Sequence, residues 1–138
     1  MGQKRIRYAV IGQGYFAQAA ILPAFESAPN SELVALFSED PHKLAELGDR
    51  YGVEHRMGYD RYDAFLSSGA VDAVYIALPN TQHCDYTVRA ARAGVHVLCE
   101  KPMATTEEEC ALMIDACHRA NVRLMIAYRL HFEADWKS

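Results

Sequence analysis

The chain has 138 residues, a length typical of one domain with a buried core. Its residues are 51% hydrophobic and 23% charged, as in a soluble globular domain, and its net charge of −4 argues against nucleic acid and anionic membranes as partners. No stretch has the length of a membrane span or the pattern of a signal peptide, so we expect a cytoplasmic protein.

The four cysteines show no metal-binding pattern, because none of them forms a Cys-x-x-Cys pair. They are Cys84, Cys99, Cys110 and Cys117. Cys99 lies in an apolar run, and the last two lie on a helical pattern. We therefore expect reduced thiols in or near the core and no metal site.

Short apolar runs alternate with helical patterns along the whole chain. We expect strands at residues 6–11, 33–37, 54–57, 73–78, 95–99 and 123–128. We expect helices at residues 16–28, 43–51, 60–67, 82–93 and 107–120. This alternation predicts an α/β fold, a doubly wound parallel sheet of about six strands.

Turn and cap residues support several of these boundaries. Asp40 and Pro41 have the types favoured as the N-cap and first residue of a helix, and Gly94 is a helix stop signal. Thr105 or Thr106 is expected to cap the last helix. Pro23 departs from the pattern and should kink or split the first helix.

A glycine-rich turn follows the first expected strand. Gly12 permits a tight turn, Gly14 permits close approach of a pyrophosphate, and Ala17 keeps the next helix near the sheet. The helix N-terminus would offer backbone N–H groups to phosphate. Such turns also occur in methyltransferases and as structural turns, but the position between strand and helix favours a dinucleotide.

The end of the second expected strand bears on the choice of cofactor. Ser38 occupies the position where an NAD enzyme usually has an acidic residue, and Lys43 follows five residues later, which favours the 2′-phosphate of NADP. NAD stays the alternative, because Glu39 and Asp40 would favour it if they point inward. A third interpretation is that residues 38–40 form only a solvated helix cap.

Polar clusters also end the fourth and fifth expected strands. Carboxyl ends of adjacent parallel strands meet at one crevice, so Asn80, His83, Glu100 and Lys101 should lie near each other. Lys101 is a candidate to bind a substrate hydroxyl group and stabilise its alkoxide, and Pro102, if cis, would aim it. The alternative is a surface lysine paired with Glu100.

Two further groups are less specific. His83 is expected to contact the cofactor near the nicotinamide ribose rather than act as general base, although a histidine at a helix start is more often structural. Residues 128–132, Tyr-Arg-Leu-His-Phe, could reach the same crevice or pack against another domain.

The sequence resembles the glucose–fructose oxidoreductase / inositol dehydrogenase family of NAD(P)-dependent sugar and polyol oxidoreductases. The resemblance runs from Ile6 to His131. It rests on Gly12-x-Gly14-x-x-Ala17, Pro79-Asn80-x-x-His83, the segment 93–104 with Glu100-Lys101-Pro102, and Ala127-Tyr128-Arg129-x-His131-Phe132. Ser38, Lys43 and the last motif are most similar to the glucose–fructose oxidoreductase branch, whose cofactor is NADP.

The resemblance implies a role for each matching position. Gly12, Gly14, Tyr15, Phe16 and Ala17 would hold the pyrophosphate, and Ser38 and Lys43 the 2′-phosphate. Leu78, Pro79, Asn80 and His83 would line the nicotinamide half, and Glu100 and Lys101 would flank the reacting carbon, with Lys101 catalytic. Arg129 would contact cofactor or substrate.

The resemblance also implies a second α+β domain that binds substrate, and we expect that domain to be absent from this chain. We therefore expect a Rossmann domain at residues 1–128 and the start of a connection at residues 129–138. The chain should bind NADP, act on a sugar or polyol only in a longer enzyme, and expose an apolar surface that favours homo-oligomers. The alternative is a stand-alone nucleotide-binding or sensor module without catalysis.

Overall fold

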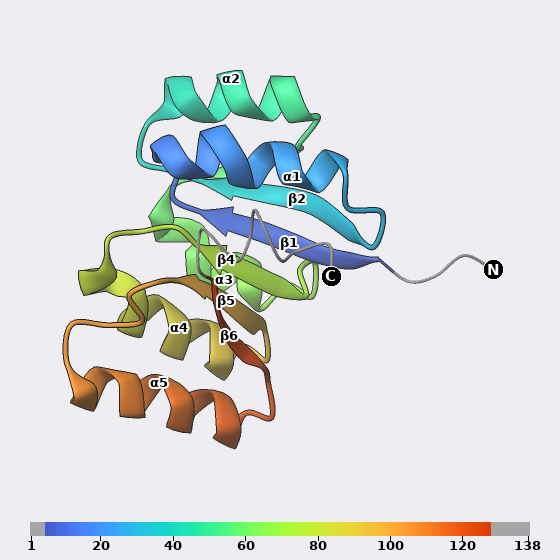
Figure 1. Cartoon of the computed structure of the whole chain (residues 1–138). Coiled ribbons are helices and arrows are strands. Elements are labelled where there is room, and N and C mark those ends of the chain that lie inside the picture. The colour runs from blue at the N-terminus through green and yellow to red at the C-terminus, as the bar shows by residue number, and fades with distance from the viewer. Residues whose placement is uncertain (1–4, 128–138) are drawn as a thin grey trace.

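A computed structural model describes residues 5–127, and within them one six-stranded sheet has helices on both faces (Figure 1). The strands are β1 (Ile6–Ile11), β2 (Ser31–Phe37), β3 (His55–Met57), β4 (Ala73–Ile76), β5 (His96–Glu100) and β6 (Leu124–Ala127). All neighbouring strands are parallel, in the order β3-β2-β1-β4-β5-β6. This doubly wound order confirms the predicted Rossmann fold.

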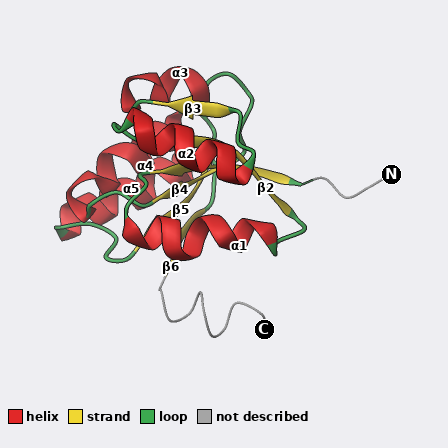
Figure 2. Cartoon of the chain, turned by 90° about the horizontal axis from the view of Figure 1, so that it is seen from above, coloured by secondary structure: helices red, strands yellow, loops and turns green. Residues whose placement is uncertain are grey.

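Five α-helices pack on the two faces of the described sheet. They are α1 (Leu22–Glu26), α2 (Pro41–Tyr51), α3 (Tyr62–Leu66), α4 (His83–Arg92) and α5 (Glu107–Arg119). Figure 1 shows α1 and α2 on one face and α4 and α5 on the other. Figure 2 gives the view from above, with α3 beside β3, where the Phe65 ring lies against the His55 ring. No helix within residues 5–127 is long and apolar enough to cross a membrane.

The disruption that Pro23 was predicted to cause in the first helix takes the form of a π-helical turn before the α-helix. A π-helical turn, Ala17–Ile21, leads directly into α1, and its closing bond runs from the Leu22 N–H to the Ala17 carbonyl. Proline has no N–H and its ring clashes with the carbonyl four residues earlier, so an ordinary α-helical turn is disfavoured at this point. The predicted first helix therefore consists of a π-helical turn followed by an α-helical turn, and the two are continuous.

Several predicted helix ends agree with the structure. Thr106 is the N-cap of α5, where its hydroxyl group accepts a hydrogen bond from the Glu109 N–H at 3.1 Å. Thr105 donates from its own hydroxyl group to the Glu109 carboxylate at 2.6 Å. Gly94 follows α4 with a φ of +77°, a conformation that favours glycine. The helix expected at 60–67 consists of a 3₁₀ turn, Tyr59–Arg61, followed by α3.

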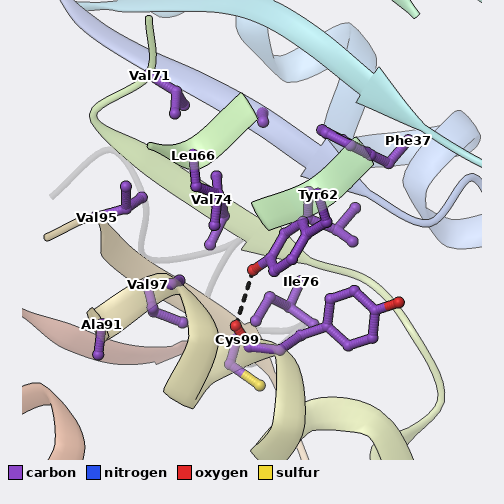
Figure 3. Close-up of a cluster of buried hydrophobic side chains, with 14 of the residues drawn as sticks. Phe37, Tyr62, Leu66, Val71, Val74, Ile76, Ala91, Val95, Val97 and Cys99 are labelled. Carbon is purple, nitrogen blue, oxygen red and sulfur yellow. Dashed lines mark hydrogen bonds between the residues drawn. The ribbon is translucent and has the colours of Figure 1, made fainter. Parts of the chain in front are cut away.

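Two buried clusters fill the spaces between the sheet and its helices. The cluster under α3, α4 and α5 includes Phe37, Val74 and Ile76 together with Tyr62 of α3 (Figure 3). The smaller cluster under α1 and α2 includes Val10, Leu36 and Tyr75 from the strands. All four cysteines are free thiols, as predicted; Cys84, Cys99 and Cys117 are buried and Cys110 is half-buried.

Candidate functional site

The glycine-rich turn connects the carboxyl end of β1 to the π-helical turn. Gly12 has a φ of +98°, and a β-carbon there would lie 2.9 Å from the Ala77 carbonyl oxygen, so the position requires glycine. Gly14 is exposed, and a β-carbon there would meet no atom within 4 Å. Ala17 is buried beneath the turn, Phe16 is half-buried and Tyr15 is 87% exposed. The turn thus leaves open space beside Gly14, where pyrophosphate is expected.

Gln13 stabilises this turn from inside, a role that the sequence did not reveal. Its side-chain amide N–H group donates to the carbonyls of Val10 at 3.0 Å and Phe37 at 3.2 Å, which ties the end of β1 to the end of β2. The amide oxygen is buried without a hydrogen-bond partner among the described residues. Gln13 therefore fixes the spacing of two strand ends that flank the turn.

The end of β2 leads through Ser38 into the N-terminus of α2. Ser38 is 6% exposed, and its hydroxyl oxygen accepts a hydrogen bond from the Asp40 N–H at 3.1 Å. The Asp40 carboxylate caps α2 and accepts from the N–H groups of His42 and Lys43 at 3.0 and 3.3 Å. Asp40 is thus turned toward the helix, while Glu39 is exposed. The predicted N-cap and the predicted first-turn Pro41 are both confirmed.

The ends of β4 and β5 lie side by side in the sheet, since these strands pair from Ala73–His96 to Ile76–Cys99. Beyond β4, Leu78 is buried, and Asn80 begins a 3₁₀ turn, Asn80–Gln82, that leads into α4. Beyond β5, Lys101 is exposed, and the Lys101–Pro102 peptide bond is cis. The polar clusters predicted on these strand ends therefore share one edge of the sheet.

Glu100 is the last residue of β5, one residue beyond the predicted strand end, and it pairs with Ala127 of β6. The Tyr75 hydroxyl group donates to the Glu100 carboxylate at 3.3 Å, a contact that sequence patterns did not indicate.

Cys99, directly before Glu100, is fully buried, and burial raises the pKa of its thiol to about 12. Cys99 is therefore protonated at neutral pH and unsuited to nucleophilic chemistry.

His83, the first residue of α4, joins the two turns. Its Nδ1 atom lies 2.9 Å from the Pro102 carbonyl oxygen and 3.2 Å from that of Met103. Its Nε2 atom lies 2.7 Å from the Leu78 carbonyl oxygen. The side chain is 1% exposed, so its predicted contact with the cofactor stays a prediction that these hydrogen bonds do not support.

The structure thus brings the described site candidates to one edge of the sheet. Gly12 and Gly14 follow β1, Ser38 follows β2, and Lys101 follows β5. The strand order places β1 next to β4, which is the topological switch point where doubly wound sheets bind ligands. Arg129 and the motif at residues 128–132 lie outside the described residues. The strand order and the grouping of these residues at the carboxyl ends of the strands identify the chain as a Rossmann-fold protein.

The sequence places the chain within that class. Residues 6–128 match the Gfo/Idh/MocA family, described as an oxidoreductase family with an NAD-binding Rossmann fold. The chain belongs to this family of oxidoreductases, and the predicted resemblance is confirmed.

Three similar proteins illustrate the family. D-xylose 1-dehydrogenase [NADP(+)] of Haloarcula marismortui is 38% identical over 129 residues, 93% of this chain and 36% of that protein. The aldose-aldose oxidoreductase of Caulobacter crescentus, solved with glycerol, has a TM-score of 0.88 and 45% identity, covering 96% of this chain and 40% of that chain. KijD10, a 3-ketoreductase of Actinomadura kijaniata solved with NADP and TDP-benzene, has a TM-score of 0.82 and 35% identity, covering 89% and 37%. The chain spans at most two fifths of each.

Proposed function

We propose that this chain binds NADP and supplies the cofactor site and the catalytic lysine of an oxidoreductase acting on a sugar or polyol. The observation that carries the proposal is the position of Lys101 at the carboxyl end of β5, on the same edge as the glycine-rich turn. Two of the three relatives have names that contain a sugar, D-xylose and aldose, and two are named with NADP. The residues described above fit the two ends of a dinucleotide.

The 2′-phosphate end of this proposal rests on the start of α2. The Ser38 hydroxyl group keeps its proton to donate, because its oxygen is the acceptor in the contact with Asp40. The Asp40 carboxylate, which would repel a phosphate and hold two ribose hydroxyl groups, is instead engaged by the helix N-terminus. Lys43 lies in the first turn of α2 and supplies positive charge there. This arrangement favours NADP over NAD.

The reaction end rests on Lys101. A nicotinamide cofactor held at this site would supply the hydride acceptor or donor. The Lys101 ammonium group donates a hydrogen bond to the substrate oxygen and stabilises the negative charge that this oxygen carries when its carbon loses hydride. In the oxidative direction the hydroxyl proton would pass to a base from water or from further protein, the hydride would pass to the nicotinamide, and the C–O bond would become C=O. We propose Lys101 as the residue that binds this oxygen, and Glu100 as the residue that flanks the reacting carbon together with it.

A further part of the proposal concerns the activity of these 138 residues without additional protein. More than half of each of the three relatives lies outside the matched region. We propose that residues 1–138 bind NADP and turn over little sugar unless further protein supplies substrate contacts. Sugar-dependent NADPH formation at ordinary enzyme rates by these 138 residues would contradict this part.

The first experiment is a calorimetric titration of the chain with NADP and, in parallel, with NAD. We expect NADP to bind more tightly, and Ser38→Asp to reverse the preference because a carboxylate repels the 2′-phosphate and accepts from ribose hydroxyl groups. Ser67→Asp, at an exposed position after α3, is the matched control that adds the same charge elsewhere. A preference for NAD in the unmodified chain would overturn the choice of cofactor. Binding of neither would overturn the site.

A further inference from the structure

We propose that His83 is a positioning residue that fixes the turn carrying Lys101 relative to the turn that follows β4. The catalytic consequence rests on the proposed function, whereas the mechanical role does not. His83 binds both turns through main-chain atoms only: Leu78 on one side, and Pro102 and Met103 on the other. The hydrogen bonds therefore set where the backbone lies, whatever side chains the turns carry.

The chemistry of the imidazole ring suits this role. We call the hydrogen bonds of His83 to Leu78 on one side and to Pro102 and Met103 on the other the His83 clamp. All three neighbours of the ring nitrogens are carbonyl oxygens, which only accept hydrogen bonds. Either neutral tautomer of His83 donates to one turn, and the imidazolium form donates to both at once. The other described histidines, at 42, 55, 96 and 118, are exposed, so His83 alone among them is enclosed in this way.

Among the described residues, a further main-chain hydrogen bond holds the turn after β5. The Lys101 N–H donates to the Ala127 carbonyl at 3.1 Å and so holds the turn to β6. The hydrogen bond between His83 and the Pro102 carbonyl involves the next residue of the turn and holds it to the start of α4. The turn that carries Lys101 is thus hydrogen-bonded to β6 on one side and to His83 of α4 on the other. If the hydrogen bond to His83 is lost, only the one to β6 remains of these two.

This clamp matters for the proposed reaction because it spans the two halves of the site. The turn of Leu78–Asn80 is predicted to line the nicotinamide, and Lys101 is predicted to bind the substrate oxygen. The distance between them decides whether hydride donor and acceptor meet, and a shift of about 1 Å can cost about 100-fold in rate. We therefore expect His83 to affect the rate of hydride transfer more than the affinity for cofactor.

The two amide replacements of histidine separate the two ends of the clamp. In His83→Asn the side-chain N–H₂ group occupies the place of Nδ1 and still reaches the Pro102 carbonyl. In His83→Gln it occupies the place of Nε2 and reaches the Leu78 carbonyl instead. The controls are His118→Asn and His118→Gln at an exposed position near the end of α5.

The readout is amide hydrogen exchange, which needs neither cofactor nor turnover. We expect His83→Gln to speed exchange of the Lys101 N–H about five- to tenfold, and His83→Asn to stay near the original rate. The reference is the Val97 N–H, which donates to the Arg123 carbonyl at 2.9 Å in the same pair of strands. Equal acceleration of both amides in both variants, or no change at Lys101 in His83→Gln, would overturn the positioning role.

The catalytic consequence is measured as NADP affinity in the same variants of this chain, and as sugar oxidation in a longer enzyme that joins each variant to a substrate-binding domain. We expect His83→Gln to lower kcat up to about 100-fold with the NADP Kd changed less than about threefold, and His83→Asn to restore most of kcat. Equal kcat in the two variants would overturn the link from clamp to rate. If the unmodified chain binds no NADP, the proposed function fails, and the exchange result still decides the clamp.

Discussion

Gly12 and Ala77 lie so close that a β-carbon on Gly12 would stand 2.9 Å from the Ala77 carbonyl oxygen. The contact joins the end of β1 to the residue after β4, the two strands at the switch point of the sheet. The Ala77 N–H in turn donates to the Ile11 carbonyl at 2.8 Å. The glycine-rich turn is therefore part of the packing of the sheet as well as a candidate phosphate site.

The two glycines of this turn should respond differently to alanine. Gly12→Ala places a methyl group against backbone at a positive φ, so we expect a loss of about 1–3 kcal/mol in the free energy of unfolding. Gly14→Ala meets open space and should leave that free energy within about 0.5 kcal/mol. Urea denaturation followed by circular dichroism measures both.

NADP binding to these two variants completes the comparison. We expect Gly14→Ala to weaken binding at least about tenfold, since its methyl group would occupy the space through which the pyrophosphate approaches the backbone. Unchanged affinity in a folded Gly14→Ala protein would show that no phosphate lies against this residue.

Tyr62 provides a test of the packing between α3 and α4. Its hydroxyl group donates to the Tyr86 carbonyl at 2.8 Å inside the core (Figure 3), and burial raises the pKa of this phenol far above its ordinary value. Tyr62→Phe should lower the free energy of unfolding by about 1 kcal/mol, because one buried hydrogen bond is lost. Tyr15→Phe, at a residue that is 87% exposed, is the control and should have no effect on unfolding. Equal stability of both variants would contradict the role assigned to this bond.

The elements of the fold could be predicted because their signals are local. Short apolar runs, Asp40 before Pro41, and Gly94 after a helical pattern each act within a few residues, and the structure agrees with them. Two strand ends differ from the prediction: β2 begins at Ser31, two residues before the predicted start, and β4 ends at Ile76, two residues before the predicted end.

The contacts within the candidate site could not be predicted in the same way. His83 meets Pro102, and Tyr75 meets Glu100, across 19 and 25 residues of sequence. These contacts exist only because β4 and β5 are neighbours in the sheet. Motif spacing placed His83 near the cofactor, but the direction of its ring depends on where the Pro102 carbonyl lies in space.

Asp63 predicts a pH dependence of stability. Arg89 donates to its carboxylate at 2.9 and 3.0 Å, and this hydrogen bonding lowers the pKa of Asp63 below its usual value. A depressed pKa in the folded state means that the contribution is complete above the unfolded pKa of about 3.9 and is lost as the pH falls through the folded pKa. The stability gained from this pair should therefore be complete at pH 7 and should decline as the pH falls below about 4.

Asp63→Asn tests this dependence. We expect the variant to be less stable than the unmodified chain at pH 7, and the difference to shrink as the pH falls below about 4. Glu54→Gln, which removes an exposed carboxylate, serves as the control. Urea denaturation at pH 7 and pH 3 measures both, and a difference for Asp63→Asn that stays constant with pH would contradict the assignment.

Lys101→Met separates chemistry from binding, because methionine keeps much of the length of the side chain and removes its charge and its donors. The exposed position of Lys101 predicts little change in folding, and we expect the NADP Kd to stay within about threefold. In a longer enzyme that joins this chain to a substrate-binding domain, hydride transfer with a sugar should fall at least about 100-fold, since the substrate oxygen loses the group that stabilises its negative charge. Lys43→Met, in the first turn of α2, is the matched control with the opposite pattern: weaker NADP binding and little change in kcat. Full activity in Lys101→Met would remove Lys101 from the mechanism, and binding without turnover in any form of the protein would favour a nucleotide-binding module instead.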